Sequence, residues 1–241
     1  MKDNRTDETP SMFEKLMELP LFRGASRQRL SQLVGDIKFH FLKYPQGETI
    51  IRAGDPCRHI AFVISGSVRA TIVNADGRFS IGQTLSSPAV IMPDFLFGKH
   101  TVYPCTVEAI DTVGILKIAK ADYLKMLNSD PVFLFNFLNT LSSNGQKALQ
   151  GILSLTTGDI DERIAYWIGA LTQPGAYDIV LTCRKRDLCS LFGMPRTVFD
   201  ASLRSMKERN LLDYTSRELS IVDRAALLSL LQHNPEDNLS D

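Results

Sequence analysis

Hydrophobic and polar residues follow three patterns along this chain of 241 residues. After a polar opening, residues 1–11, which we expect to be a loose tail, apolar residues recur at helical spacing as far as Gly35. From Phe39 to Ile118, short runs of Val, Ile, Phe and Thr alternate with glycine turns, which predicts strands. Helical spacing returns after Ile118 and dominates the rest of the chain.

The strand-rich region has clear turn signals. Ser65-Gly66-Ser67 separates the predicted strands Ile60–Ile64 and Val68–Val73, and Asn74-Ala75-Asp76-Gly77 follows as a hairpin turn. No helical pattern intervenes, so we expect an antiparallel β-barrel or jelly roll rather than a parallel sheet. With helices before and after it, the predicted fold class is α+β.

A long helix is predicted from Asp130-Pro131, where Asp130 can cap and Pro131 fits the first turn. Apolar or small residues recur along it at spacings of four and three, a pattern typical of two helices packed together. They are Leu134, Leu138, Leu141, Gly145, Ala148, Ile152 and Leu155. We therefore expect a homodimer with this seam as its spine, and Phe133, Phe137 and Leu149 against the barrel. The alternative is one amphipathic helix buried on its own domain.

The C-terminal part predicts a helix-turn-helix. A capping signal at Asp159 starts one helix, a strand over residues 178–182 follows, and a short helix then leads to Gly193 and a longer helix over about residues 196–209. Two apolar runs, 211–214 and 219–222, are expected to pair as a wing. Basic residues gather here and give the electrostatic footprint of a surface for DNA phosphates. They include Arg184, Lys185, Arg186, Arg196, Arg204, Lys207 and Arg209.

Composition and charge narrow the class of protein. The chain has 27 basic and 27 acidic residues, so its positive charge is local rather than general. No apolar run approaches the length of a membrane span, and the opening residues do not form a secretory signal. The four cysteines are dispersed, which favours a cytoplasmic protein with reduced thiols.

Three motifs give the chain a resemblance to the CRP/FNR (catabolite activator / fumarate-nitrate regulator) superfamily of bacterial transcription factors. They are Gly47-Glu48-x-Ile50 with Ile60-x-Phe62-Val63-Ile64-Ser65-Gly66-Ser67-Val68, then Arg163-Ile164-Ala165, and Asp187-Leu188-x-x-x-Phe192-Gly193-Met194-x-Arg196. The resemblance implies a cyclic-nucleotide-binding-type barrel, a dimerisation helix and a winged helix-turn-helix. We expect residues 1–128 to form the effector-sensing domain, 129–157 the dimerisation helix and hinge, and 158–241 the DNA-binding domain.

The resemblance also implies a regulator that binds double-stranded DNA at a near-palindromic operator and acts with RNA polymerase. Arg196 stands where the family reads a base, Thr197 can contact a thymine methyl, and Asp200 can accept from cytosine or pair with Arg204. Lys185 stands where the family grips phosphate, and Arg184, Arg204 and Arg217 are further candidates.

The effector is where this chain departs from the family pattern. Tyr103-Pro104-Cys105 replace the Arg-Ser-Ala run that holds a cyclic phosphate, which argues against cyclic AMP. No cysteine cluster precedes Cys57, which argues against an iron–sulfur cluster. The residues in and around this run are mostly apolar or aromatic, so we expect them to line an apolar pocket that could hold haem or a small organic effector. They are Met92, Phe95, Phe97, His100, Tyr103 and Cys105.

Two alternatives from other classes stay open. The chain could be a cyclic-nucleotide-binding regulatory module of a kinase or channel, although the helix-turn-helix argues against that. It could also be a cupin-like metal enzyme, but its histidines lack metal-binding spacing. With no nucleophile–base pair or phosphate-binding glycine loop evident, we do not expect an enzyme.

Overall fold

The structure is a computed structural model that describes residues 12–156 and 158–232. Two short α-helices and one 3-10 helix open the described chain: α1 (Met12–Glu18), η1 (Pro20–Phe22) and α2 (Arg27–Asp36). The side chain of Ser26 caps α2 by accepting a hydrogen bond from the backbone N–H of Arg29, as expected of a serine just before a helix. The expected loose tail, residues 1–11, lies outside the described residues.

Antiparallel strands then build the predicted barrel of jelly-roll type. They are β1 (Phe39–Tyr44), β2 (Thr49–Ile51), β3 (His59–Ser65), β4 (Ser67–Val73), β5 (Ser80–Ser86), β6 (Ala89–Ile91), β7 (Cys105–Ala109) and β8 (Val113–Ala119), with the 3-10 helix η2 (Pro93–Phe95) after β6. One sheet has the order β1-β8-β3-β6, and β5, β4, β7 and β2 are neighbours in a second sheet. Val63, Ile81 and Val107 of these strands are fully buried, and Phe62, the neighbour of Val63 in β3, packs on the other face against Phe22 of η1 with ring centroids 5.4 Å apart.

The turn between β3 and β4 shows why the motif there contains glycine. Gly66 has a φ of 75°, and a Cβ atom at this position would lie 2.7 Å from the carbonyl oxygen of Thr112. The next residue, Ser67, donates its backbone N–H to the side chain of Asp111 over 3.0 Å. A side chain at position 66 would therefore disturb the point where two strands of the barrel meet.

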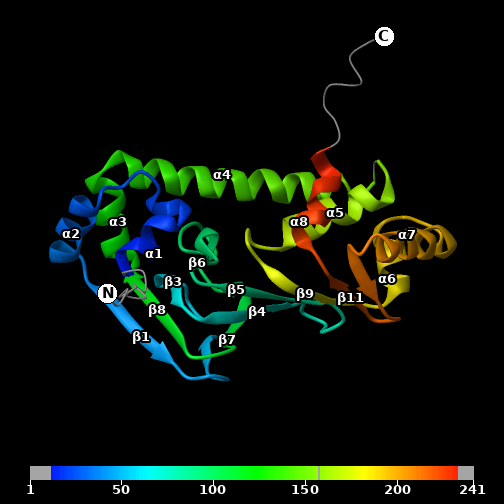
Figure 1. Cartoon of the computed structure of the whole chain (residues 1–241), viewed down its shortest axis with the longest axis horizontal. Helices are drawn as coiled ribbons and strands as arrows, with labels where there is room; N and C mark the ends of the chain where they lie inside the picture. The colour runs from blue at the N-terminus through cyan, green and yellow to red at the C-terminus, as the bar shows by residue number, and fades with distance from the viewer. Residues whose placement is uncertain (1–11, 157, 233–241) are drawn as a thin grey trace, which may run out of the picture.

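Two helices carry the chain away from the barrel: α3 (Lys120–Ser129) and α4 (Pro131–Leu153). Asp130 caps α4 by accepting from the backbone N–H of Val132 over 2.9 Å, as predicted. Figure 1 shows α4 as a long rod along one side of the molecule, passing over the barrel toward the C-terminal helices. Phe133 and Phe137 face the barrel and are buried, but the expectation for Leu149 is wrong, because its side chain is 57% exposed.

The C-terminal part forms the predicted winged helix-turn-helix. Its elements are α5 (Ile160–Leu171), β9 (Tyr177–Thr182), α6 (Lys185–Leu191), α7 (Arg196–Glu208), β10 (Leu212–Tyr214), β11 (Glu218–Ile221), α8 (Arg224–Ser229) and η3 (Leu230–Gln232). Asp159 and Asp223 cap α5 and α8 with their carboxylates. β10 and β11 pair antiparallel as the wing, with Asp213 opposite Ser220.

A feature that the sequence did not predict joins the barrel to the C-terminal part. β9 pairs on one side with β11 and on the other with β5 of the barrel, so seven strands form one sheet in the order β10-β11-β9-β5-β4-β7-β2. Figure 1 shows β9 continuing the barrel sheet toward the wing. At this junction, Arg69 of β4 donates hydrogen bonds to the side chains of Thr84 (3.1 Å) and Asp178 (2.8 Å). The sheet thus crosses the boundary expected near residue 158.

Between residues 12 and 232, leaving out residue 157, no helix has both the length and the apolar character that a membrane crossing requires.

Candidate nucleic-acid interface

The helix-turn-helix is held by an aromatic core. Phe192 at the end of α6 stacks on Phe199 of α7 with ring centroids 6.0 Å apart, and Leu203 and Met206 are fully buried on the same side of α7. Gly193 has a φ of 62°, which lets the chain reverse between the two helices. This core fixes α7 with its other face toward solvent.

Arg196 opens the exposed face of α7. Its side chain is 76% exposed, and Thr197 and Arg204 are also exposed on this face. Asp200 is half-buried beside them, and its carboxylate lies 2.9 Å from Nζ of Lys185 and 3.5 Å from Nε of Arg196. The alternative in which Asp200 pairs with Arg204 is therefore not the arrangement found.

Lys185 is expected from its place in the motif to contact a DNA phosphate, but its side chain is held by other groups of the protein. Its ammonium group contacts Asp200 and lies 4.3 Å from the centroid of the Tyr214 ring, and its side chain is only 16% exposed. The hydrogen bond from Lys185 and the nearby Arg196 keep the pKa of Asp200 below its usual value, so this carboxylate stays charged at neutral pH. Lys185 thus orients Asp200, and through it Arg196, at the start of α7.

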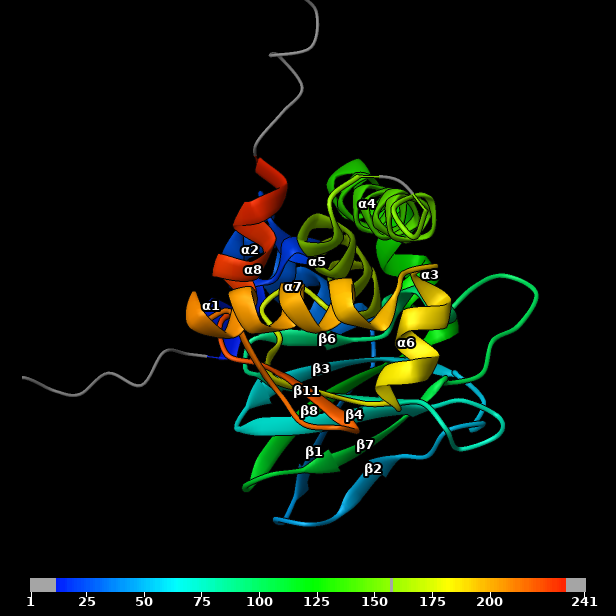
Figure 2. The ribbon, with the colours of Figure 1, turned by 90° about the vertical axis from the view of Figure 1, so that its right-hand side faces the viewer.

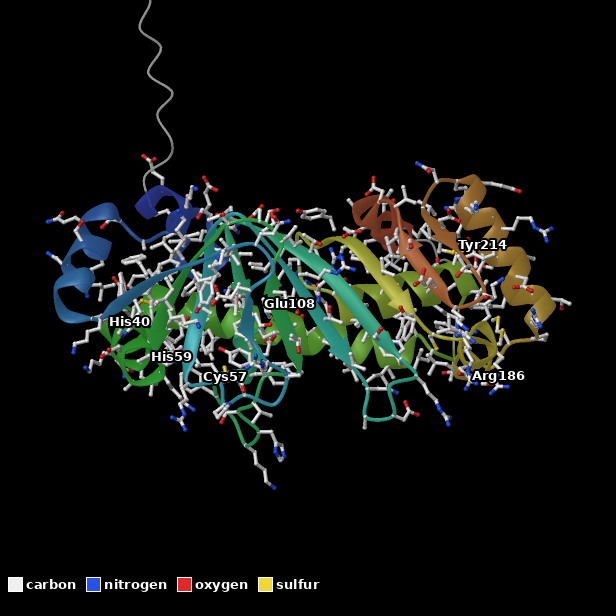
Figure 3. All side chains as sticks on the ribbon, turned by 90° about the horizontal axis from the view of Figure 1, so that it is seen from below. His40, Cys57, His59, Glu108, Arg186 and Tyr214 are labelled. Atoms are coloured by element: carbon white, nitrogen blue, oxygen red, sulfur yellow. The ribbon has the colours of Figure 1, made fainter. Side chains whose placement is uncertain are left out.

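The basic residues meet in a hollow between α6, the start of α7 and the wing, with a volume of about 510 Å³. We call it the wing hollow; its lining residues are Arg184, Lys185, Arg186, Arg196, Tyr214, Thr215, Ser216 and Arg217. Figure 3 shows the labelled Arg186 and Tyr214 at the same end of the molecule, far from His40 and His59. Asp187 pairs with both Arg184 (2.8 Å) and Arg186 (3.3 Å), but none of the acidic side chains that the structure describes lines the hollow itself. A concave surface with this charge attracts phosphate groups.

The structure brings together most of the predicted DNA-contact residues: Arg184, Lys185, Arg196 and Arg217 line the wing hollow, and Thr197, Asp200 and Arg204 lie on α7 beside it. Four lining residues were not among the predicted contacts: Arg186, Tyr214, Thr215 and Ser216. Arg186 belongs to the basic run 184–186 and could have been included on that ground. Tyr214 had no signal in the sequence, because its role depends on how the wing folds back onto α6.

Arg163 of the Arg163-Ile164-Ala165 motif has a structural role. Its guanidinium group is buried and donates to the carbonyl oxygens of Ser154 (3.1 Å), Leu155 and Phe192. These carbonyls belong to the segment after α4 and to the end of α6. One side chain therefore ties the hinge to the helix-turn-helix.

The seam residues of α4 lie mostly at the surface. Leu134, Leu138, Gly145, Ala148 and Ile152 are exposed, whereas Leu141 and Leu155 are half-buried and pack on the core. α4 itself ends at Leu153, two residues before the last predicted seam position. Five exposed apolar side chains, which we call the α4 stripe, lie toward the two ends of the helix: Leu134 and Leu138 near its start, and Leu149, Ile152 and Leu153 near its end. Exposed apolar side chains grouped in this way are typical of an interface.

The residues of the predicted effector pocket are packed against one another or exposed. Tyr103 is buried and donates its hydroxyl to the carbonyl oxygen of His59 over 2.9 Å, and Cys105 is completely buried. Met92 is buried and Phe97 contacts Phe137, with ring centroids 5.6 Å apart. Phe95 is half-buried and His100 is exposed. None of these six residues lines the wing hollow, and none lines a second cavity that lies between α4 and the barrel.

Burial explains the chemistry of the thiols. It raises the pKa of Cys105 to about 12, and it also raises the pKa values of Cys57, Cys183 and Cys189. These thiols are therefore protonated at neutral pH and weakly nucleophilic. Within the described ranges, no group of three or more His, Cys, Asp and Glu side chains is arranged to hold a metal ion.

Residues 41–130 match the model of the cyclic nucleotide-binding domain family. The chain is 23% identical over 180 residues to the cAMP-activated global transcriptional regulator CRP of Haemophilus influenzae, covering 72% of this chain and 80% of that protein. It is 24% identical over 192 residues to the cAMP-activated global transcriptional regulator Vfr of Pseudomonas aeruginosa, covering 76% and 89%. Among solved structures, the catabolite activator protein of Thermus thermophilus is 21% identical, with a TM-score of 0.48 and coverage of 88% and 97%.

Proposed function

Because the chain belongs to the CRP/FNR superfamily of bacterial transcription factors, we propose that it is a homodimeric, sequence-specific DNA-binding regulator. The observation that carries the proposal is the wing hollow, whose exposed arginines adjoin the solvent-facing start of α7. Residues 1–128 would then be the sensing domain, 129–157 the dimerisation helix and hinge, and 158–241 the DNA-binding domain. Its place of action is the cytoplasm, its partners are operator DNA and RNA polymerase, and it is not an enzyme.

The two groups of residues have different tasks on DNA. Arg196 presents a fork that matches O6 and N7 of guanine in the major groove, and Thr197 lies next to it for a thymine methyl. Arg184, Arg186 and Arg217 surround the wing hollow and bind phosphates, which sets position rather than sequence. Lys185 holds Asp200, so its main task is to orient the reading residues.

Dimerisation places two DNA-binding surfaces, one from each copy, on the same operator. The α4 stripe offers apolar side chains to the same strip of a second copy, and Gly145 and Ala148 let the two helices approach. A twofold axis along α4 relates two helix-turn-helix units, so the operator is a near-palindrome with half-sites about 10 bp apart or a multiple of this.

The effector of this regulator is not cyclic AMP. The positions that would hold the cyclic phosphate are occupied by the neutral side chains of Tyr103, Pro104 and Cys105, and two of these are buried. An anionic phosphate there would lack a paired cation, which is strongly unfavourable in a buried site. Calorimetry with cyclic AMP is expected to detect no binding, and micromolar affinity would contradict this part of the proposal.

Two arginine variants test the DNA-binding role. Arg196→Ala is expected to lose about 1–3 kcal/mol on the operator, with preference relaxed at one base pair per half-site. Arg217→Ala is expected to weaken all sequences about equally and to reduce the salt dependence by about one counterion per protomer. Binding is measured by fluorescence anisotropy on an operator selected from random duplexes, at several salt concentrations.

Arg78→Ala is the matched control, because Arg78 is an exposed arginine on the β4–β5 hairpin that does not line the wing hollow. This variant should bind DNA like the wild type. The base-reading role of Arg196 is refuted if Arg196→Ala weakens operator and random DNA by the same factor. Failure to select any sequence from random duplexes would refute the proposed function as a whole.

A further inference from the structure

A second cavity of about 510 Å³ lies between α4 and the barrel. Its walls come from four parts of the chain: the segment around η1, the β5–β6 hairpin together with Pro93 of η2 just after it, one side of α4, and the turn of residues 173–175 that leads from α5 to β9. Figure 2 looks nearly along α4 and shows α5 beside it, with the barrel strands beneath. We call this space the helix cavity. Its volume is within the range of small-molecule sites.

The helix cavity is separate from the positions that the family uses for a cyclic phosphate. Tyr103 and Cys105 do not line it, and Ala148 lies on α4 outside its wall. It is also separate from the α4 stripe, because the cavity is lined by the polar side of α4. Asn136, Asn139, Thr140, Ser143 and Lys147 recur there at helical spacing. A second copy bound along the stripe would leave this side of α4 free.

The lining combines an apolar surface with positive charge. Leu21, Leu85 and Val90 form an apolar wall, and Phe135 stands at the edge. Among the described residues, the charged ones that line the cavity are Arg23 and Lys147, and no acidic residue lines it. The carboxylate of Asp94 lies nearby, but both of its oxygens accept hydrogen bonds from Asn144 at 2.9 Å.

Gln173 supplies a polar group at the base of the cavity. Its backbone N–H donates to Oε1 of Gln83 (2.7 Å) and its Nε2 donates to the carbonyl oxygen of Val90 (3.1 Å), which fixes the side chain. Its own Oε1 is buried and accepts no hydrogen bond from any described residue. An ionised carboxylate has no proton to donate, so this acceptor takes no part in binding an anion.

We propose that the helix cavity binds a small organic anion with an apolar body, such as a medium-chain carboxylate. The apolar body lies against the wall of Leu21, Leu85 and Val90, and the carboxylate lies at Lys147, where it is paired with positive charge. The inference rests on the cavity alone, so it stands or falls separately from the proposed DNA binding.

The test uses isothermal titration calorimetry on the full chain with three probes of equal chain length. Decanoate carries the anion, decan-1-ol lacks the charge, and decyltrimethylammonium reverses it. We expect decanoate to bind at one site per chain, decan-1-ol to bind at least tenfold more weakly, and the cation not to bind. Lys147→Met should weaken decanoate about tenfold without changing decan-1-ol. The control is Lys99→Met, which removes an exposed lysine outside the cavity.

A second variant fills the space instead of removing the charge. Asn139 is an exposed lining residue on α4, so Asn139→Trp should fold and should abolish binding of decanoate and decan-1-ol alike. Equal affinity of decanoate for the wild type, Lys147→Met and Asn139→Trp would overturn the proposal. So would equal affinity of the wild type for all three probes, which would indicate binding to the α4 stripe.

Discussion

The wing hollow and the helix cavity have the same volume, about 510 Å³, but opposite linings. Five of the eight residues around the wing hollow are Arg or Lys, whereas two of the twenty around the helix cavity are. The first is a patch of cations facing solvent, suited to a chain of phosphates. The second is an apolar space with charge at one side, suited to a single small anion. Lining chemistry, rather than size, therefore distinguishes what each can bind.

The two hollows also differ in the number of copies of the chain that each requires to act. The helix cavity is complete within one chain, because all of its walls come from the described residues of a single copy. In the function we propose, the wing hollow is one half of a DNA-binding surface, since a near-palindromic operator requires two copies. The shared sheet connects them: residues 173–175 line the helix cavity and lead into β9, which pairs with the wing.

The largest expected effect comes from breaking the dimer. In the double variant Leu138→Glu with Ile152→Glu, two charges stand in the α4 stripe of each copy and would be buried next to each other in the dimer. We expect a monomer by sedimentation and operator affinity reduced about 100-fold or more, because the two reading units no longer bind together. Decanoate binding should not change, since neither residue lines the helix cavity.

The control for this variant is Gln150→Glu, which adds a charge to an exposed position of α4 outside the stripe. It should remain dimeric and bind the operator like the wild type. A double variant that sediments as a stable dimer would show that the partner surface lies elsewhere.

The features that sequence predicts well here are local ones. Ser26, Asp130, Asp159 and Asp223 each cap the helix that follows, because a cap needs only backbone N–H groups one turn away. The apolar face of α7 was equally readable from its spacing. These signals were sufficient to predict the order barrel, long helix and winged helix-turn-helix.

The features that sequence did not predict depend on contacts between distant segments. The pairing of β5 with β9 joins strands almost a hundred residues apart, and both have ordinary strand sequences. Asp200 has a basic residue one turn on at Arg204, yet Lys185 lies closer in space because α6 crosses the start of α7. The helix cavity combines four separate segments, and no spacing rule brings them together.

The junction between the two regions gives the next largest effect. Arg69 is mostly buried there, and its guanidinium group binds Thr84 and both the side chain and the backbone carbonyl of Asp178. Arg69→Ala leaves these acceptors without their donor, so we expect unfolding by urea to become easier by about 1–3 kcal/mol. Arg78→Ala on the adjacent hairpin should change stability by less than about 0.5 kcal/mol. Equal stability of the two variants would mean that the junction contributes little.

The pH dependence of stability tests whether solvent is excluded from the interior of the barrel. Burial raises the pKa of Cys105 from 9.0 to about 12, so between these values the folded protein holds a proton that the unfolded chain has lost. Raising the pH in this window therefore favours unfolding, by about 1.4 kcal/mol per pH unit for this one group. The contribution is fully present below pH 9.0 and is lost as the pH approaches 12. Cys105→Ala removes it, so its unfolding free energy should fall less steeply between about pH 9 and 10.5 than that of the wild type. Identical slopes would show that Cys105 titrates at its ordinary value, and hence that solvent enters the barrel at the position where the sequence predicted an effector pocket.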